Sequence, residues 1–140
     1  MKLKKLETKF CSLIFPEGWT VDFNQKPLAI YRKDAEGGVI QISSWTNESG
    51  KNPGTAKDRL SNFLEKKKSD IKIKTYKKKD FDLAVSDYYS KSESGEWYNR
   101  DIVALSKHKM AFITYTVKYS KRKERLKEAE RILKSFSFPE

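Results

Sequence analysis

The sequence is poor in the residues that build reactive or cross-linked sites. Its 140 residues contain one cysteine, Cys11, and one histidine, His108. A single cysteine excludes an intramolecular disulfide and a zinc site built on several cysteines. Arginine is also scarce, because only six of the 30 basic residues are arginine and the rest are lysine. Arginine is favoured where a planar fork binds phosphates or base edges, so the lysine bias is more typical of a solvated surface.

Long apolar runs are missing too. The first apolar segment, residues 10–15, is far shorter than the roughly 20 residues of a membrane span, and no other stretch approaches that length. Ser12 interrupts the segment, and the Pro16-Glu17-Gly18 turn after it is unlike a signal-peptidase site. We therefore expect no membrane span and a cytoplasmic location.

The residues that are present predict one folded domain over residues 1–140. The length is ordinary for a single domain, and it allows burial of roughly two thirds of the surface of the unfolded chain. Charged residues make up 35% of the sequence, which can signal disorder. The 18 aromatic residues favour a packed core instead, because large apolar side chains recur in nearly every segment.

Two periodicities predict the fold class. Apolar and polar residues alternate in segments 10–15, 19–23, 28–32, 39–45, 71–74, 82–91, 96–107 and 109–119, as in half-buried strands. Helical spacing follows Thr55, a candidate helix cap, and returns over residues 121–135. Short turns join the long strands, which makes them antiparallel. We predict an α+β fold with an antiparallel sheet of about six to eight strands and two main helices, closing over a common interior.

The positive charge lies in three segments. The formal net charge is +11, and residues 66–79 contribute +7, residues 118–134 contribute +5 and residues 1–9 contribute +3. Such segments attract polyanions even without a designed site.

One surface pattern combines lysines with aromatic rings. Alternation places four residues of the basic segment 66–79 on one face of their strand, and two aromatic residues open a later strand. Interleaved lysines and rings are typical of surfaces that bind single-stranded nucleic acid, whereas the same rings are also common packing partners across strands. The candidate binding surface consists of Lys72, Lys74, Tyr76, Lys78, Trp97 and Tyr98.

No catalytic, metal or cofactor site is predicted. His108 sits among lysines in an expected turn and has no carboxylate nearby in sequence to orient it. Cys11 lies in an expected strand, where a buried cysteine is inert. Residues 50–55 miss the spacing of a phosphate-binding loop. The acidic residues between 80 and 101 are irregularly spaced, and we expect them to neutralise lysines across strands.

Several short motifs resemble those of PsbP-like and Mog-type domains. They are the Phe15-Pro16-Glu17-Gly18-Trp19 turn, the strand at residues 38–42, the late strand at residues 113–116 and the closing segment at residues 132–138. The resemblance implies an antiparallel sheet with helices packed on it, and a mostly non-catalytic superfamily of accessory or docking proteins, one branch of which binds the Ran GTPase. Many bacterial members are exported or lipidated, and this chain differs from them there. None of its residues matches a known partner-binding motif, so no functional residue carries over.

Two functions from different classes compete. The first is a non-catalytic accessory domain that binds a protein partner, as the missing catalytic groups and the resemblance suggest. The second is an anion-binding module for nucleic acid or an acidic surface, which the lysine-rich segments favour. A small enzyme would require a cleft that holds at least two of the residues Asp82, Asp87, Asp101 and His108.

Overall fold

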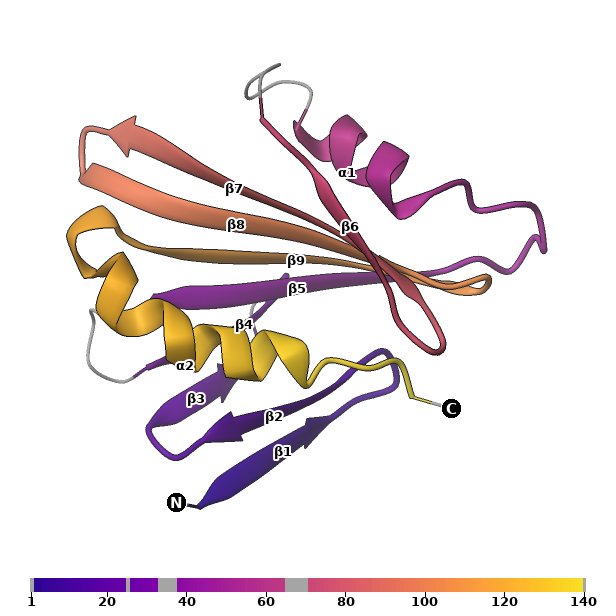
Figure 1. Ribbon diagram of the computed structural model, residues 1–140. Helices are drawn as coiled ribbons and strands as arrows, with labels where there is room; N and C mark the ends of the chain where they lie inside the picture. Colours follow the sequence, from indigo (N-terminus) through magenta and orange to yellow (C-terminus); the bar gives the residue numbers. More distant parts are fainter. Residues whose placement is uncertain (1, 25, 33–37, 65–70, 140) are drawn as a thin grey trace.

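A seven-stranded antiparallel sheet forms the centre of the protein (Figure 1). The computed structural model describes residues 2–24, 26–32, 38–64 and 71–139. The strand order in the sheet is β3-β4-β5-β9-β8-β7-β6. The strands are β3 (Trp19–Asp22), β4 (Leu28–Arg32), β5 (Val39–Thr46), β6 (Lys74–Lys77), β7 (Asp82–Ser92), β8 (Gly95–Leu105) and β9 (Lys109–Lys118).

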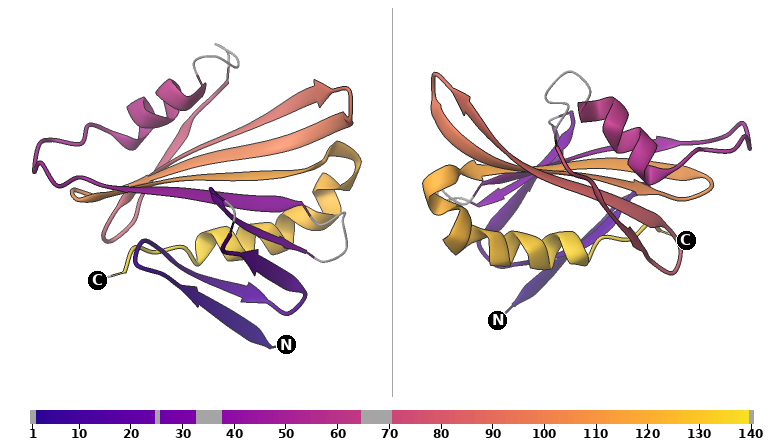
Figure 2. Two further views of the ribbon diagram at one scale, coloured as in Figure 1. Left: turned by 180° about the vertical axis from the view of Figure 1, so that it is seen from behind. Right: turned by 45° about the horizontal axis from the view of Figure 1, so that its top comes forward.

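Three further elements cover the two faces of this sheet. Helix α1 (Ala56–Leu64) packs on one face, over β7 and β8. Helix α2 (Arg122–Lys134) lies on the other face, beside a separate two-stranded hairpin of β1 (Leu3–Glu7) and β2 (Ser12–Pro16). Both views of Figure 2 show the two helices on opposite sides of the sheet. The predicted α+β class, with an antiparallel sheet and two main helices, is therefore confirmed.

Each face of the sheet has its own core. On the α1 side, Leu60 and Val103 are fully buried. On the α2 side, Ile40, Tyr115 and Ile132 are fully buried. Burial of one such aliphatic side chain stabilises the fold by roughly 1.5–3 kcal/mol. The prediction of one common interior is wrong in this respect, because side chains alternate between the two faces of each strand and both faces are covered.

Polar contacts join α2 to the far edge of the sheet. The indole N–H of Trp19 on β3 donates to the Glu128 carboxylate on α2, and Arg32 on β4 forms an ion pair with the same carboxylate at 2.5 Å. The α1 helix begins as predicted, since the Thr55 hydroxyl accepts the backbone N–H of Asp58 at 3.1 Å. Within the described ranges, no helix combines the length and apolar character needed to cross a membrane.

Some predicted element bounds differ from the structure. The strand expected at residues 10–15 is β2, which begins at Ser12, and its partner β1 was missed. The strand expected at residues 71–74 is β6, which begins at Lys74. The lysines expected to end the first helix, Lys66 to Lys68, lie outside the described residues.

Candidate functional site

A groove of about 740 Å³ runs between β6 and α2 on the α2 side of the sheet. We call it the β6–α2 groove. Its first wall consists of β6 and its flanking residues, and its second wall consists of the last turn of α2 and Phe136. A space of this size is within the usual range for ligand pockets. Its floor is aliphatic and is formed by Leu83, Val85, Ile102 and Ile113.

The strand register explains how the groove forms. Lys74 pairs with Val85, and Tyr76 pairs with Leu83. Paired residues in an antiparallel sheet point to the same face, so Lys74 and Tyr76 stand beside the aliphatic floor. Lys72 and Lys78, two residues before and two residues after this pair, also line the groove. Four of the six predicted surface residues therefore lie together along one wall.

The floor is only partly covered by the protein itself. Ile102 and Ile113 are 6% and 1% exposed, but Leu83 and Val85 are half-buried, as is Leu133 on the opposite wall. Tyr76 is 48% exposed, which is high for an aromatic ring. The groove therefore presents an apolar surface that a bound partner would cover.

Aromatic rings close one end of the groove. Phe81 packs edge-to-face against Phe136 and Phe138, with ring centroids 5.8 and 5.5 Å away. This arrangement is the favoured geometry of aromatic pairs. The cluster ties the C-terminal segment to the turn that follows β6, so it fixes the position of both walls at this end.

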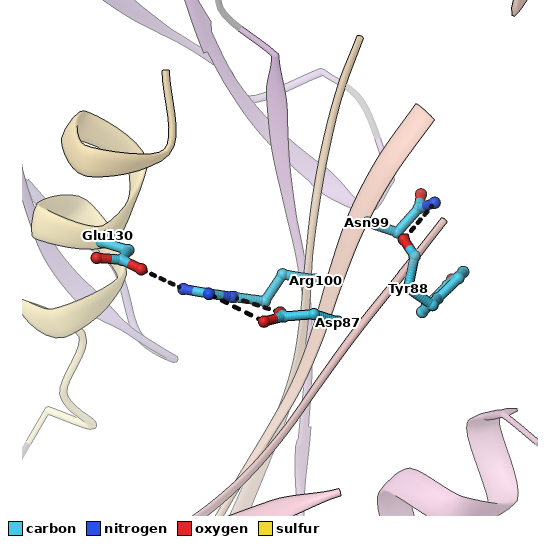
Figure 3. A network of polar contacts seen from close by, with 5 residues as sticks. All are labelled: Asp87, Tyr88, Asn99, Arg100 and Glu130. Carbon is cyan, nitrogen blue, oxygen red and sulfur yellow. Dashed lines mark hydrogen bonds and ion pairs between the residues drawn. The ribbon is translucent and has the colours of Figure 1, made fainter. Parts of the chain in front are cut away.

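Three charged residues meet at the other end of the groove (Figure 3). The Arg100 guanidinium on β8 donates two hydrogen bonds to the Asp87 carboxylate on β7, at 2.7 and 3.1 Å. It also forms an ion pair with Glu130 on α2 at 3.0 Å. Burial acts to lower the pKa of Arg100, but its hydrogen bond and charge attraction to Asp87, with a smaller contribution from Glu130, raise that pKa above its ordinary value. Arg100 is therefore charged, and it is already paired with two carboxylates of its own chain.

The groove lysines differ from Arg100 in their ion pairing. Six cationic residues line the groove against three acidic ones, which gives the lining a net charge of +3. Within the described part of the chain, none of the five lysines has an ion-pair partner. They are Lys72, Lys74, Lys78, Lys79 and Lys134. The aliphatic floor with its lysine rim is suited to an anionic partner that also has apolar side chains.

Trp97 and Tyr98 do not line this groove. They are neighbours on β8, so their side chains point to opposite faces of the sheet. Tyr98 packs against the α2-side core, where burial first and then the charge of Asp87 raise its pKa to about 12. Trp97 faces the α1 side and lines a second depression of about 600 Å³. The aromatic platform of the sequence hypothesis is therefore split between two faces.

A polar network on the α1 side was missed in the sequence. Asn99 donates to the Ser90 hydroxyl at 2.9 Å and accepts from the Thr116 hydroxyl at 3.1 Å. Figure 3 shows its weaker contact with the backbone of Tyr88. These bonds satisfy the buried amide of Asn99 and link β7, β8 and β9. Isolated polar residues in a strand give no sequence signal for such a network.

The other candidate groups are dispersed. Asp87 lines the β6–α2 groove, whereas Asp101 is 2% exposed on the opposite face and accepts a hydrogen bond from the Tyr88 hydroxyl. His108 lies in the turn before β9, where its backbone carbonyl accepts the Asn47 N–H. Asp82 lines a different depression, beside Lys79 and Ser106. These four side chains therefore lie in different parts of the structure. The expected cross-strand neutralisation occurs at Asp87, but its partner is Arg100 and not a lysine.

Cys11 is 1% exposed, and burial raises the pKa of its thiol despite the opposing effect of its side-chain hydrogen bond with Thr8. A raised pKa disfavours the nucleophilic thiolate. Among the residues whose positions are described, no three His, Cys, Asp or Glu side chains gather closely enough to hold a metal ion.

Comparisons with known proteins show the fold alone. No family model matches the sequence, and a search of curated proteins finds no significant match. A crystal structure from Bacteroides thetaiotaomicron is similar over the whole of this chain, with 19% identity and a TM-score of 0.72, and the chain spans 50% of that protein. The solution structure of cyanobacterial PsbP (CyanoP) from Synechocystis sp. PCC 6803 is similar over 98% of this chain and 92% of its own, with 11% identity and a TM-score of 0.66.

The fold is thus PsbP-like, as one part of the sequence resemblance implied. The similarity extends along nearly the whole chain and is not confined to the short motifs that suggested it. At these identities the activity and partners of those proteins do not transfer, because one fold hosts many functions.

Proposed function

We propose that the chain is a non-catalytic accessory domain that binds a protein partner through the β6–α2 groove. The observation that carries the proposal is the partly exposed aliphatic floor beside five lysines that lack ion-pair partners within the described residues. Both the PsbP-like and the Mog-type parts of the resemblance imply accessory proteins, and they support the same reading. We further propose that residues 1–140 act as one domain in the cytoplasm.

The groove is better suited to a polypeptide than to a small charged ligand. An aliphatic floor contributes through apolar contact, and lysine ammonium groups contribute through position and steering. A polypeptide that carries both carboxylates and apolar side chains satisfies both requirements. Arg100 is occupied by Asp87 and Glu130, so the bidentate grip that favours a phosphate ligand is not offered here.

Partner capture with matched charge variants tests the proposal. The groove variant carries Lys72→Glu, Lys74→Glu and Lys78→Glu, and the control carries the same three charge reversals at Lys4, Lys57 and Lys123. The control residues are exposed on β1, α1 and α2 and lie away from the groove. Quantitative mass spectrometry of proteins captured from the source cells should recover one partner with the wild type and the control.

The groove variant should recover that partner about tenfold less, because each reversed charge is repelled by an acidic partner. Equal recovery with both variants would show that the groove does not carry the interaction. Robust catalytic turnover by the purified chain, with no specific partner, would defeat the proposal altogether.

Anion binding is the second candidate, and the five groove lysines favour it, since they have no ion-pair partner among the residues that the structure describes. If Lys72, Lys74 and Lys78 neutralise three phosphates of single-stranded DNA, the logarithm of affinity falls with the logarithm of salt concentration with a slope of about −2. The three glutamate substitutions should abolish that dependence. Undetectable or salt-insensitive binding at about 50 mM salt rules this candidate out. The position of Trp97 on the opposite face weakens it, because Tyr76 is the only one of the three predicted rings that lies beside these lysines.

A further inference from the structure

The wall of the β6–α2 groove is also an edge of the sheet. β6 is the last strand in the order of the seven-stranded sheet, and within the described ranges no strand pairs with its outer side. All four of its residues are exposed. An edge strand presents unpaired backbone groups that pair readily with another extended chain. The β6 edge therefore offers hydrogen bonds beside the groove, in addition to the apolar floor and the lysines.

The register identifies which backbone N–H groups of β6 point away from β7. Lys78 donates its N–H to the Phe81 carbonyl at 2.9 Å, so this pair is of the hydrogen-bonded kind. Hydrogen-bonded and non-hydrogen-bonded pairs alternate along an antiparallel ladder. Tyr76 with Leu83 and Lys74 with Val85 are consequently hydrogen-bonded pairs. The N–H groups of Thr75 and Lys77 then point away from β7, toward the outer edge.

We infer that the partner binds β6 as an added strand, through a short extended segment that is acidic on the groove side. This inference rests on the proposed function and specifies how the partner engages the groove. Thr75 and Lys77 supply the backbone hydrogen bonds to the segment. Its residues opposite Lys74 and Lys78 are carboxylates, since opposite charges directly across a strand pair are favourable. Its residue opposite Tyr76 is apolar and contacts the ring.

Charge selects an acidic partner over a second copy of this chain. Pairing of β6 with β6 would bring the lysines of Lys72–Lys79 against the same lysines, and like charges directly opposite one another are destabilising. Edge lysines are a common protection against self-association. In this protein the lysines disfavour pairing of β6 with a second copy of the chain, and they attract a segment of opposite charge.

A defined peptide tests the inference on the full chain. The probe is capped Thr-Glu-Val-Leu-Val-Glu-Thr, which reads the same in both directions and so assumes neither strand orientation. Its matched control has lysine in place of both glutamates. Amide hydrogen exchange followed by NMR should show about tenfold slower exchange at Thr75 and Lys77 when the probe is bound, as expected for a newly formed hydrogen bond. The Tyr76 amide, which already bonds to β7, should be unchanged, and the control peptide should protect neither site.

Two variants of Thr75 give an independent readout. Thr75→Pro removes only the outward N–H, which an edge strand tolerates, and should weaken probe binding about tenfold. Thr75→Val keeps the N–H and should bind as the wild type does. If Thr75→Pro fails to fold, the exchange measurement on the wild type still decides the matter.

The outcomes separate the inference from the proposed function. A probe that shifts the resonances of Leu83 and Val85 without protecting Thr75 or Lys77 overturns strand addition and leaves groove binding in place. A probe that does not bind, or that binds no better than its lysine control, overturns the acidic strand. Whether the proposed function itself is wrong is decided by partner capture with the lysine variants, because that experiment assumes no mode of binding.

Discussion

Alanine at Gly38 is expected to destabilise the protein by about 2–5 kcal/mol, whereas alanine at Gly18 costs about 1–2 kcal/mol. Both glycines have positive φ, 86° and 102°, so both substitutions carry the cost of a left-handed residue. A Cβ at Gly38 would lie 2.7 Å from the Tyr115 ring and 2.8 Å from the Thr116 carbonyl oxygen. That oxygen belongs to the central strand β9 and cannot move aside cheaply. A Cβ at Gly18 meets nothing within 4 Å.

Urea unfolding followed by tryptophan fluorescence measures both changes. The free energy of unfolding comes from linear extrapolation to zero urea, and the two variants should share the slope of the wild type. The difference between them isolates the steric contribution, roughly 1–3 kcal/mol, because the backbone cost is common to both. Equal destabilisation of the two variants would refute the reasoning, since it would mean that the start of β5 does not press against β9.

Three further predictions test burial and ionisation. Leu60→Ala should cost about 2–5 kcal/mol of unfolding free energy, because Leu60 on α1 is fully buried against the sheet. Leu3→Ala, at a 64% exposed site, should cost less than about 0.5 kcal/mol in the same urea assay. Tyr98, with its pKa of about 12, keeps its proton between pH 10 and 12 in the native state while the unfolded chain loses it, so unfolding free energy should fall as pH rises through that window. Asp87→Asn should lower the Tyr98 pKa in an ultraviolet titration, and an unchanged value would contradict the assigned role of Asp87. Cys11 should react with a thiol reagent only after unfolding, and rapid reaction in native buffer would show that the turn between β1 and β2 opens.

The fold class was predictable because the long strands alternate clearly. Ile113, Tyr115 and Val117 face one side of β9, and Thr114 and Thr116 between them face the other, an alternation that predicts the strand and its more deeply buried side. The stripe that includes Leu60 likewise predicted which side of α1 packs on the sheet. These segments carry strong periodicity, and periodicity is what a sequence displays directly.

β1 was missed because most of it is exposed. Only Leu6 of its five residues is buried, so the lysines around it hide the alternation. Its partner β2 holds it in place, and β2 is in turn joined to the C-terminal segment by the bridge between Ser12 and Ser137. Such a strand is stabilised by long-range pairing, which leaves no periodic trace in the local sequence.

One wall of the candidate site was predictable from the sequence, and the opposite wall was not. Alternation along one strand placed Lys72, Lys74, Tyr76 and Lys78 together, and the structure places all four on one wall of the groove. The opposite wall comes from α2, nearly sixty residues later in the chain, and only the tertiary fold brings it there. Their role in binding stays a prediction.

The most direct measurement of the central claim is photo-crosslinking from within the groove. A photoreactive phenylalanine derivative replaces Tyr76, which is 48% exposed on the groove wall, and in a matched protein it replaces Phe23, which is 66% exposed and away from the groove. On irradiation in the source cells, the residue at position 76 should crosslink to one protein through an acidic, extended segment. Crosslinks from position 23 to that protein at equal yield, or none from position 76, would contradict the account.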